Sequence, residues 1–285
     1  MTSSMASFSD KHLAVCGLAR NCAAKLSSNI QFIEALATYF ASITVVVVEN
    51  DSTDQTRIIL NNWAANPSVK IIDGDPGTLV APANTKANPY YSIKRVARLA
   101  ALRNQYLDYV RSLPTPPHFL LVMDFDVDRI SLEGVLNSFA RAADWDVATA
   151  YGYSLSPVLK ERYHDTFALV PLGAEKTPQR AGPLKAIQRA WRQNKESNQL
   201  VPVYAAFGGL AIYKYQQIIQ LQYGVCPNGD EVVEARCEHF YLADQLQKNG
   251  YQRIVINPRM HLRFQTLGDA LQKKVADWLR PSRGV

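Results

Sequence analysis

The sequence predicts an α/β fold with a mostly parallel central sheet flanked by helices. Residues 43–48 and 119–123 are continuous apolar runs, typical of strands buried on both faces. Stretches with apolar residues at helical spacing alternate with such runs, which favours a parallel sheet covered by helices. The chain has 285 residues, 47% of them hydrophobic, and no repeat or low-complexity tract divides it. We therefore expect one domain over residues 1–285 with a sizeable core.

The N-terminal part of the chain predicts a strand, a helix and a second strand. Residues 12–19 form an apolar run, residues 21–40 carry apolar side chains at helical spacing, and the run over residues 43–48 follows. A polar segment, residues 49–56, comes next. It can cap the following helix, because Asp54 would complement the positive end of that helix. Ligands of parallel sheets bind beyond the carboxyl ends of the strands, so the same segment is also a candidate binding edge.

The run over residues 119–123 ends in alternating carboxylates. Asp124 and Asp126 share one side of the predicted strand end. Such close anions repel one another unless a cation lies among them, and hard oxygen ligands suit Mg²⁺ or Mn²⁺. Solvated acids or helix caps are the alternative for a strand end of this kind. We predict a divalent metal site at Asp124 and Asp126 that also holds phosphates.

Arg103 lies in the middle of the apolar stripe of a helix predicted over residues 94–113. A guanidinium among apolar neighbours needs a partner. It can snorkel to solvent, pair with a carboxylate of residues 124–128, or hold a ligand diphosphate. We expect one of the last two.

The second half of the chain predicts shorter elements with polar residues between them. Asp165 is either a turn residue or part of an acceptor site. The pair Gly208 and Gly209 enters a strand, where glycine permits either the close approach of a sugar or a plain bend. The elements expected here are a helix opening at residue 131, a strand over 146–153, a helix starting at 237 and a last strand over 253–258.

Polar residues of the last helix and strand are further candidates. Glu238 lies in the first helical turn, which favours a carboxylate, and it can point toward the sheet edge. Glu238 and Asp244 fall on the polar arc of this helix, whereas His239 falls on the apolar arc as a satisfied core histidine. His261 follows the last predicted strand and is a candidate third metal ligand through its neutral imidazole.

Charge and cysteine content limit the class of protein. The net charge of +6 and the pI of about 9.1 favour an anionic small ligand or an anionic membrane surface over nucleic acid. The four cysteines have no C-x-x-C spacing, so neither a zinc knuckle nor a disulfide framework is indicated, and a reducing, cytoplasmic location fits best. No run approaches the roughly 20 apolar residues of a membrane span.

Two segments are expected outside the sheet. An amphipathic helix predicted over residues 266–285 would pack on the core or dock shallowly on a membrane as a peripheral contact. The basic, proline-containing residues 171–200 form either a solvated loop and helix or a mobile cover over the site.

Several motifs in this order resemble one glycosyltransferase layout. Residues 48–56 resemble the nucleotide-binding segment Asp-Asp-Gly-Ser-Thr-Asp, with Glu49 and Asn50 in place of the two aspartates. The layout is similar to the GT-A nucleotide-sugar glycosyltransferases, and most closely to the fungal capsular mannosyltransferase family and its bacterial and viral relatives, over about residues 12–264. The other matching segments are Arg20–Asn21, Arg103–Asn104, Asp124–Asp126, Tyr163–Leu169, Gly208–Gly209, Cys237–His239 and Ile256–Pro258.

The resemblance implies a single GT-A domain with a nucleotide-binding half at about 10–130 and an acceptor half at about 131–265. The implied reaction moves a sugar from a nucleotide-diphosphate sugar to a glycan or glycolipid hydroxyl in polysaccharide or surface-glycan synthesis. The implied cofactor is Mn²⁺ or Mg²⁺, held by Asp124, Asp126 and His261. Contacts to the nucleotide sugar are implied at Gly17, Arg20, Glu49, Asn50, Asp51, Arg103, Asp124, Phe125 and Gly209.

The resemblance also implies candidates for the catalytic base. In an inverting transfer a carboxylate takes the proton of the acceptor hydroxyl, and Glu238 is the first candidate, Asp165 the second and Asp244 the third. A retaining transfer needs no base in that position. The sequence leaves both stereochemical outcomes open.

Two other classes compete with this interpretation. A sugar-phosphate nucleotidyltransferase should carry a glycine-rich, basic phosphate loop after the first strand, and residues 16–21 lack that richness. A noncatalytic glycan- or nucleotide-binding domain has no need of the costly pair Asp124 and Asp126. Dehydrogenase and P-loop classes are excluded because neither glycine fingerprint is present.

Overall fold

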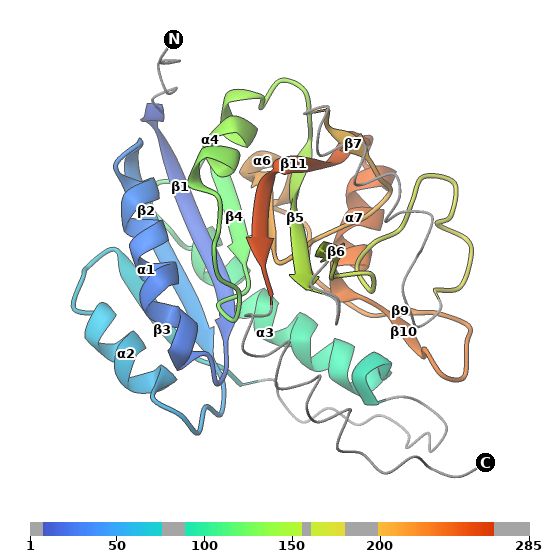
Figure 1. Ribbon diagram of the computed structural model, residues 1–285, viewed down its shortest axis with the longest axis horizontal. Helices are drawn as coiled ribbons and strands as arrows, with labels where there is room; N and C mark the ends of the chain where they lie inside the picture. Colours follow the sequence, from blue (N-terminus) through green and yellow to red (C-terminus); the bar gives the residue numbers. More distant parts are fainter. Residues whose placement is uncertain (1–7, 76–88, 156–160, 180–198, 265–285) are drawn as a thin grey trace.

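The computed structural model of the chain describes residues 8–75, 89–155, 161–179 and 199–264, and its ribbon is shown in Figure 1. Its strands are β1 (Phe8–Ala19), β2 (Phe40–Glu49), β3 (Val69–Asp73), β4 (Phe119–Met123), β5 (Val147–Leu155), β6 (Glu161–Tyr163), β7 (Val201–Pro202), β8 (Leu210–Lys214), β9 (Cys226–Pro227), β10 (Ala235–Arg236) and β11 (Ile254–Arg263). Its helices are α1 (Ala23–Ala37), α2 (Thr56–Trp63), the 3₁₀ helix η1 (Pro89–Tyr91), α3 (Ile93–Arg111), α4 (Leu132–Ala140), α6 (Tyr215–Ile218) and α7 (Glu238–Lys248).

One nine-stranded sheet runs through the molecule in the order β3-β2-β1-β4-β8-β5-β11-β7, with β6 paired to β5 (Figure 1). The pairs β3–β2, β2–β1, β1–β4 and β5–β11 are parallel. Strand β8 is antiparallel to both β4 and β5, and it therefore enters the sheet at the edge where β4 ends. The predicted α/β class, with a mostly parallel sheet flanked by helices, is confirmed.

Helices cover both faces of this sheet because the strands alternate apolar side chains between two cores. Leu13 and Val15 of β1 pack in one core with residues of α1, α2 and α4. Ala14 and Cys16 of the same strand pack in the other core with residues of α3, α6 and α7. The carboxyl ends of β1, β2 and β4 lie at one edge of the sheet (Figure 1).

The structure corrects several predicted boundaries. Strand β11 continues to Arg263, with a register shift between Asn257 and His261, so His261 lies within a strand and not beyond it. Strands β3 and β6 are not anticipated by the sequence pattern, because each is short and lies at the margin of the sheet. The predicted helix over residues 266–285 and most of the basic segment 171–200 lie outside the described residues.

Two further expectations concern membranes and disulfides. Among the described residues, no helix combines the length and the apolar character needed to span a bilayer. All four cysteines are free thiols, as expected. The predicted division into a nucleotide-binding half and an acceptor half stays a prediction, and both halves contribute strands to the same sheet.

Gly17 allows β1 and β4 to lie close together beneath the functional edge. A Cβ atom at this position would lie 2.1 Å from the main-chain oxygen of Met123 and 2.8 Å from the ring of Phe125. We expect Gly17→Ala to lower the free energy of unfolding by about 1–3 kcal/mol, because neither a paired strand nor a buried ring can move away cheaply. Urea denaturation measures this change, and an unaltered midpoint would contradict it.

Candidate active site

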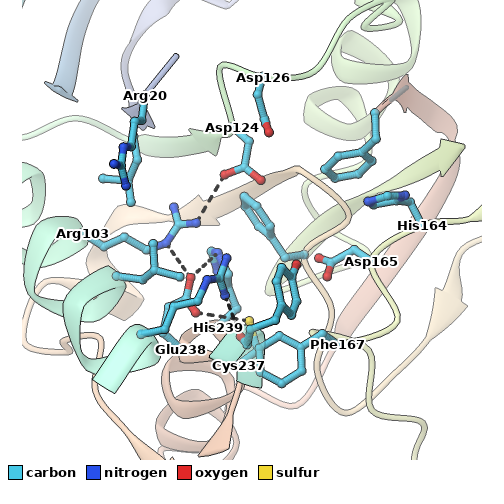
Figure 2. Close-up of a pocket in the computed structure, with 16 residues that line it drawn as sticks. Arg20, Arg103, Asp124, Asp126, His164, Asp165, Phe167, Cys237, Glu238 and His239 are labelled. Atoms are coloured by element: carbon cyan, nitrogen blue, oxygen red, sulfur yellow. Dashed lines mark hydrogen bonds and ion pairs between the residues drawn. The ribbon is translucent and has the colours of Figure 1, made fainter. Parts of the chain in front are cut away.

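A cavity of about 330 Å³ lies where β1 and β4 end, and Figure 2 shows its lining. It therefore occupies the place where parallel α/β sheets bind their ligands. Its walls come from both halves of the chain. They consist of Leu18, Arg20, Tyr90, Arg95, Leu99, Arg103, Asp124, Asp126, His164, Asp165, Phe167, Phe207, Cys237, Glu238, His239 and Phe264.

Asp124 and Asp126 follow β4 directly and lie at this cavity. The amide of Asp124 donates to the carbonyl of Gly209 at 3.0 Å, which holds the turn against the antiparallel β8. Burial raises the pKa of Asp124 to about 7, with further upward contributions from the charges of Asp126 and Asp165. Asp126 is exposed at the rim. The negative charges of Asp124, Asp126 and Asp165 therefore repel one another, and a bound cation would reduce this repulsion.

Arg103 pairs with two carboxylates, one from each half of the sequence: Asp124 and Glu238 (Figure 2). Its Nε atom lies 2.9 Å from Glu238 Oε1, and its Nη2 atom lies 3.3 Å from Asp124 Oδ1. The arginine is 4% exposed and Glu238 is 3% exposed. The expectation that Arg103 pairs with a carboxylate at the strand end is confirmed. Its Nη1 atom is buried without a hydrogen-bond partner among the described residues.

Glu238 is held by its neighbours and does not lie on a solvated helix face. Glu238 accepts a hydrogen bond from Arg103 and a second one from the thiol of Cys237, with 3.4 Å between Sγ and Oε2. Although Glu238 falls on the polar arc by periodicity, it lines the cavity at the sheet edge. Packing of α7 against α3 turns the first turn of the helix inward, and the ion pair with Arg103 permits the burial.

Asp165 lies on the opposite side of the cavity from Arg20 (Figure 2). Its Oδ2 atom accepts the amide of Gly208 at 3.0 Å, and its Oδ1 atom accepts the amide of Ala168 at 3.3 Å. Burial raises the pKa of this carboxyl to about 6, which the two amides oppose and the charge of Glu238 reinforces. The carboxylate is thus oriented by the backbone and titrates close to neutral pH.

His239 differs from its predicted role. The residue is buried, as expected, and its ring stacks on Phe207 with 3.7 Å between centroids. Neither ring nitrogen, however, has a hydrogen-bond partner within the described part of the chain, so it is not a satisfied core histidine. Burial, reinforced by the charge of Arg103, lowers its pKa well below the ordinary value, and the imidazole that borders the cavity is neutral.

A second cavity of about 440 Å³ adjoins the first. The two share Leu18, Arg20, Arg95 and Leu99, so they lie side by side at the sheet edge, and we call them together the groove. Asn50 lines the second cavity. Its side chain is fixed by a hydrogen bond to the carbonyl of Gly74 at 2.8 Å and by Arg98 at 2.5 Å. These contacts give the second cavity a preformed polar wall.

The predicted site residues divide into three groups by position. Arg20, Arg103, Asp124, Asp126, Asp165 and Glu238 are brought together in the first cavity, and Arg20 and Asn50 in the second. Gly17, Phe125 and Gly209 are buried and do not line either cavity. Glu49, Asp51 and His261 also lie outside both linings.

The acidic residues after β2 are engaged with arginines. Glu49 is 1% exposed and pairs with Arg57, and it also accepts the amide of Ser52 at 2.8 Å. Asp51 is exposed and pairs with Arg98 at 2.8 Å. The predicted contacts of Glu49 and Asp51 with a nucleotide therefore require these ion pairs to open, whereas Asn50 is already directed to the groove.

His261 does not join the two aspartates. Its Nδ1 atom lies 3.0 Å from the carbonyl of Arg259, and it pairs with Tyr151 within the sheet. Among the described residues, no group of three or more histidine, cysteine, aspartate or glutamate side chains is close enough to hold a metal. The proposed third ligand is therefore not supported. The third candidate base, Asp244, is bound by Tyr204 at 2.7 Å and by Lys248, away from the cavity.

Several lining residues are not identified by the sequence analysis. Tyr90 and Arg95 flank the start of α3, and Phe264 follows the end of β11. His164 precedes Asp165 and stacks on Phe264 with 4.2 Å between ring centroids. The tyrosine pair at residues 90 and 91 is a sequence signal for this wall, because tyrosine is enriched in binding interfaces.

The groove brings strand-end carboxylates and arginines together at the carboxyl edge of the sheet, where α/β enzymes bind their ligands. A family model described as "Cryptococcal mannosyltransferase 1" matches residues 18–273. The chain belongs to this family and is a glycosyltransferase. Together with the mostly parallel sheet, this membership confirms the predicted resemblance to the GT-A glycosyltransferases.

Comparison with curated proteins gives no significant sequence match. Solved structures similar to the chain include the mannosyltransferase PcManGT from Pyrobaculum calidifontis in complex with GDP-Man and Mn²⁺, at 15% identity and a TM-score of 0.48 over 98% of this chain and 68% of that one. S. aureus TarS 1–349 has 14% identity and a TM-score of 0.48 over 96% and 67%. Glucosyl-3-phosphoglycerate synthase from Mycobacterium tuberculosis, in complex with Mn²⁺, UDP and glucosyl-3-phosphoglycerate, has 16% identity and a TM-score of 0.47 over 96% and 82%.

Proposed function

We propose that the chain transfers a sugar from a nucleotide-diphosphate sugar to a hydroxyl of a glycan or glycolipid, with the help of a divalent metal ion. The observation that carries this proposal is the pair of adjoining cavities, of which the first is lined by Asp124 and Asp126 and the second by Asn50. Arg20 and Arg95 line both cavities. A diphosphate that joins a base to a sugar would lie beside these two cations, where its charge is best compensated.

Asp124 and Asp126 fit Mn²⁺ or Mg²⁺ because they offer carboxylate oxygens whose negative charge is incompletely balanced. Asp124 has a raised pKa because burial and neighbouring carboxylates leave its negative charge incompletely balanced. Asp124 and Asp126 would hold the ion, and the diphosphate and water would supply the remaining oxygen ligands, as is usual for Mg²⁺ at phosphate sites. When bound, the ion would stabilise the negative charge of the departing nucleoside diphosphate.

Other residues of the chain would contact the donor and take the proton of the acceptor. Arg103, held by two carboxylates, directs its Nη1 atom to a ligand oxygen. The acceptor oxygen attacks the anomeric carbon, and the bond from that carbon to the diphosphate breaks with its electron pair on the diphosphate. In an inverting transfer the hydroxyl proton passes to a carboxylate of the protein.

For that proton acceptor, the geometry supports Asp165 over Glu238 and so reverses the order proposed from the sequence. Glu238 is tied to Arg103 at 2.9 Å and is 3% exposed. Asp165 is oriented by two amides and has a pKa of about 6, which is close to the pH at which it would act. A base with a pKa near the working pH is both ionised and able to take a proton.

We expect Asp165→Asn to lower turnover by about 10²–10⁴-fold while the affinity for the donor nucleotide stays unchanged. The carboxylate must be ionised to act, so the wild-type rate should rise with pH through about 6, and this limb should be absent from the residual activity of the variant. Steady-state kinetics between pH 5 and 8, roughly the range that spans this titration, measures both effects. Glu238→Gln is the comparison, and loss of turnover in Glu238→Gln with normal turnover in Asp165→Asn would return the role to Glu238.

The donor is tested by calorimetric titration of GDP, UDP and dTDP with and without Mn²⁺, followed by transfer assays with the matching sugar nucleotide. Because the family model is that of a mannosyltransferase, we expect GDP to bind most tightly and GDP-mannose to be the donor. Release of the nucleoside diphosphate during sugar transfer supports the proposal. Pyrophosphate-dependent exchange would indicate a nucleotidyltransferase, and no binding of any nucleotide would indicate a noncatalytic domain.

A further inference from the structure

Aromatic side chains form one wall of the first cavity on the side of Asp165. Tyr90 and Phe167 both line the cavity, with 6.0 Å between their ring centroids. Tyr91 packs against Phe167 at 4.8 Å and against Tyr90 at 4.9 Å. Tyr90 nevertheless remains 50% exposed. A large aromatic residue at the mouth of a cavity, packed against other rings but open to solvent, is a feature of binding surfaces and not of the core.

The segments that carry these rings are anchored to the rest of the molecule. Tyr90 lies in η1, which leads directly to the N-cap of α3, where Ser92 Oγ accepts the amide of Arg95 at 3.2 Å. The guanidinium of Arg95 lies 4.1 Å from the centroid of the Tyr90 ring. The carbonyl of Phe167 accepts from the side chain of Gln179 at 2.8 Å. The wall therefore exists before any ligand binds, which lowers the entropic cost of binding.

The charges around the cavity separate two regions. Figure 2 shows Arg20 and Arg103 on one side and Asp165 on the other, between His164 and Phe167. Arg103 is already engaged by two carboxylates. The carboxylate of Asp165 does not favour an anionic group beside it, although the guanidinium of Arg95 packs on the ring of Tyr90.

The geometry points to this wall as the acceptor subsite, with Tyr90 and Phe167 stacking against a neutral pyranose ring whose hydroxyl faces Asp165. This inference rests on the proposed function. A pyranose has a face of C–H groups that packs on aromatic rings and a belt of hydroxyls that hydrogen-bonds to carboxylates, and the wall offers both partners side by side. The acceptor class is therefore a neutral glycan and not a phosphorylated small molecule.

The test measures acceptor binding separately from activity. The full chain is loaded with GDP and Mn²⁺, and saturation-transfer NMR is recorded with methyl α-mannopyranoside, methyl β-glucopyranoside and methyl β-galactopyranoside, and with 3-phosphoglycerate as the anionic probe. We expect at least one neutral pyranoside to receive saturation. Tyr90→Ala and Phe167→Ala should each weaken this binding about tenfold, because each removes a stacking ring. Tyr90→Phe keeps the ring and should bind as the wild type does.

The controls distinguish the possible failures. Ile58→Ala removes an apolar side chain that is 61% exposed on α2, far along the chain from this wall, and should leave pyranoside binding unchanged. Calorimetry with GDP and Mn²⁺ should give the same affinity in all variants. Absence of GDP, UDP and dTDP binding in the wild type would reject the proposed function itself. Normal GDP binding with pyranoside binding unaffected in both alanine variants, or with binding of 3-phosphoglycerate alone, would overturn only the acceptor subsite.

Discussion

Replacing Asp126 with asparagine is expected to reduce sugar transfer by about 10³-fold and to abolish the effect of Mn²⁺ on nucleotide binding. A metal at a leaving diphosphate contributes several kcal/mol to the transition state, and about 4 kcal/mol corresponds to this factor. Asp126 is exposed at the rim, so its substitution should leave the unfolding midpoint unchanged. Transfer kinetics and calorimetry with and without Mn²⁺ measure the loss.

Asp144→Asn is the matched control for this experiment. Asp144 is an aspartate whose side chain is 51% exposed, and it pairs with Arg141 instead of lining the cavity. The control should retain the wild-type rate and its dependence on Mn²⁺. If Mn²⁺ still stimulates sugar transfer by Asp126→Asn as it does in the wild type, the metal role proposed for this carboxylate is ruled out.

Replacing Arg103 with leucine is expected to lower the free energy of unfolding by about 3–5 kcal/mol, because a buried carboxylate would lose its counterion. Glu238 is 3% exposed, and its Oε1 atom lies 2.9 Å from Arg103 Nε. For a chain of this size the change corresponds to a fall in Tm of roughly 5–8 °C. Transfer should also be lost, since Arg103 links Asp124 and Glu238 at the cavity.

Two variants test whether charge explains that loss of stability. Combining Arg103→Leu with Glu238→Gln should recover part of the Tm, since a neutral amide needs no counterion. Arg141→Leu removes an exposed ion pair with Asp144 and should change stability by no more than about 0.5 kcal/mol. A Tm for Arg103→Leu equal to that of the wild type would show that the buried ion pair does not stabilise the fold.

Local sequence patterns predicted the sheet and one edge of the site. The runs at residues 43–48 and 119–123 became β2 and β4, and the helix expected over 94–113 became α3. Arg103 was expected to hold either a strand-end carboxylate or a ligand diphosphate, and it pairs with Asp124 in a cavity that Asp126 also lines. These predictions succeed because burial of a strand or a helix face depends on spacing along the chain, and parallel strands end at a common edge.

Other features were decided by contacts between distant segments. The sequence placed His261 beyond a strand and His239 in a satisfied core, but the register of β11 holds His261 in the sheet, and His239 borders the cavity without a hydrogen-bond partner among the described residues. Helical periodicity placed Glu238 on the polar arc of its helix, and packing of α7 on α3 buries it against Arg103. Periodicity describes a single helix or strand and does not show which other element packs against it.

The sequence by itself therefore determined the α/β class, the strand that ends in Asp124 and Asp126, and the need of Arg103 for an anionic partner. Only the tertiary structure decided that Asp165 and the ring of Tyr90 lie at the same cavity as those carboxylates. Tyr90 and Asp165 are 75 positions apart in the sequence. The reason is physical. An isolated segment fixes its own periodicity, whereas the distances, charges and pKa values of a site depend on side chains that folding brings together from both halves of the chain.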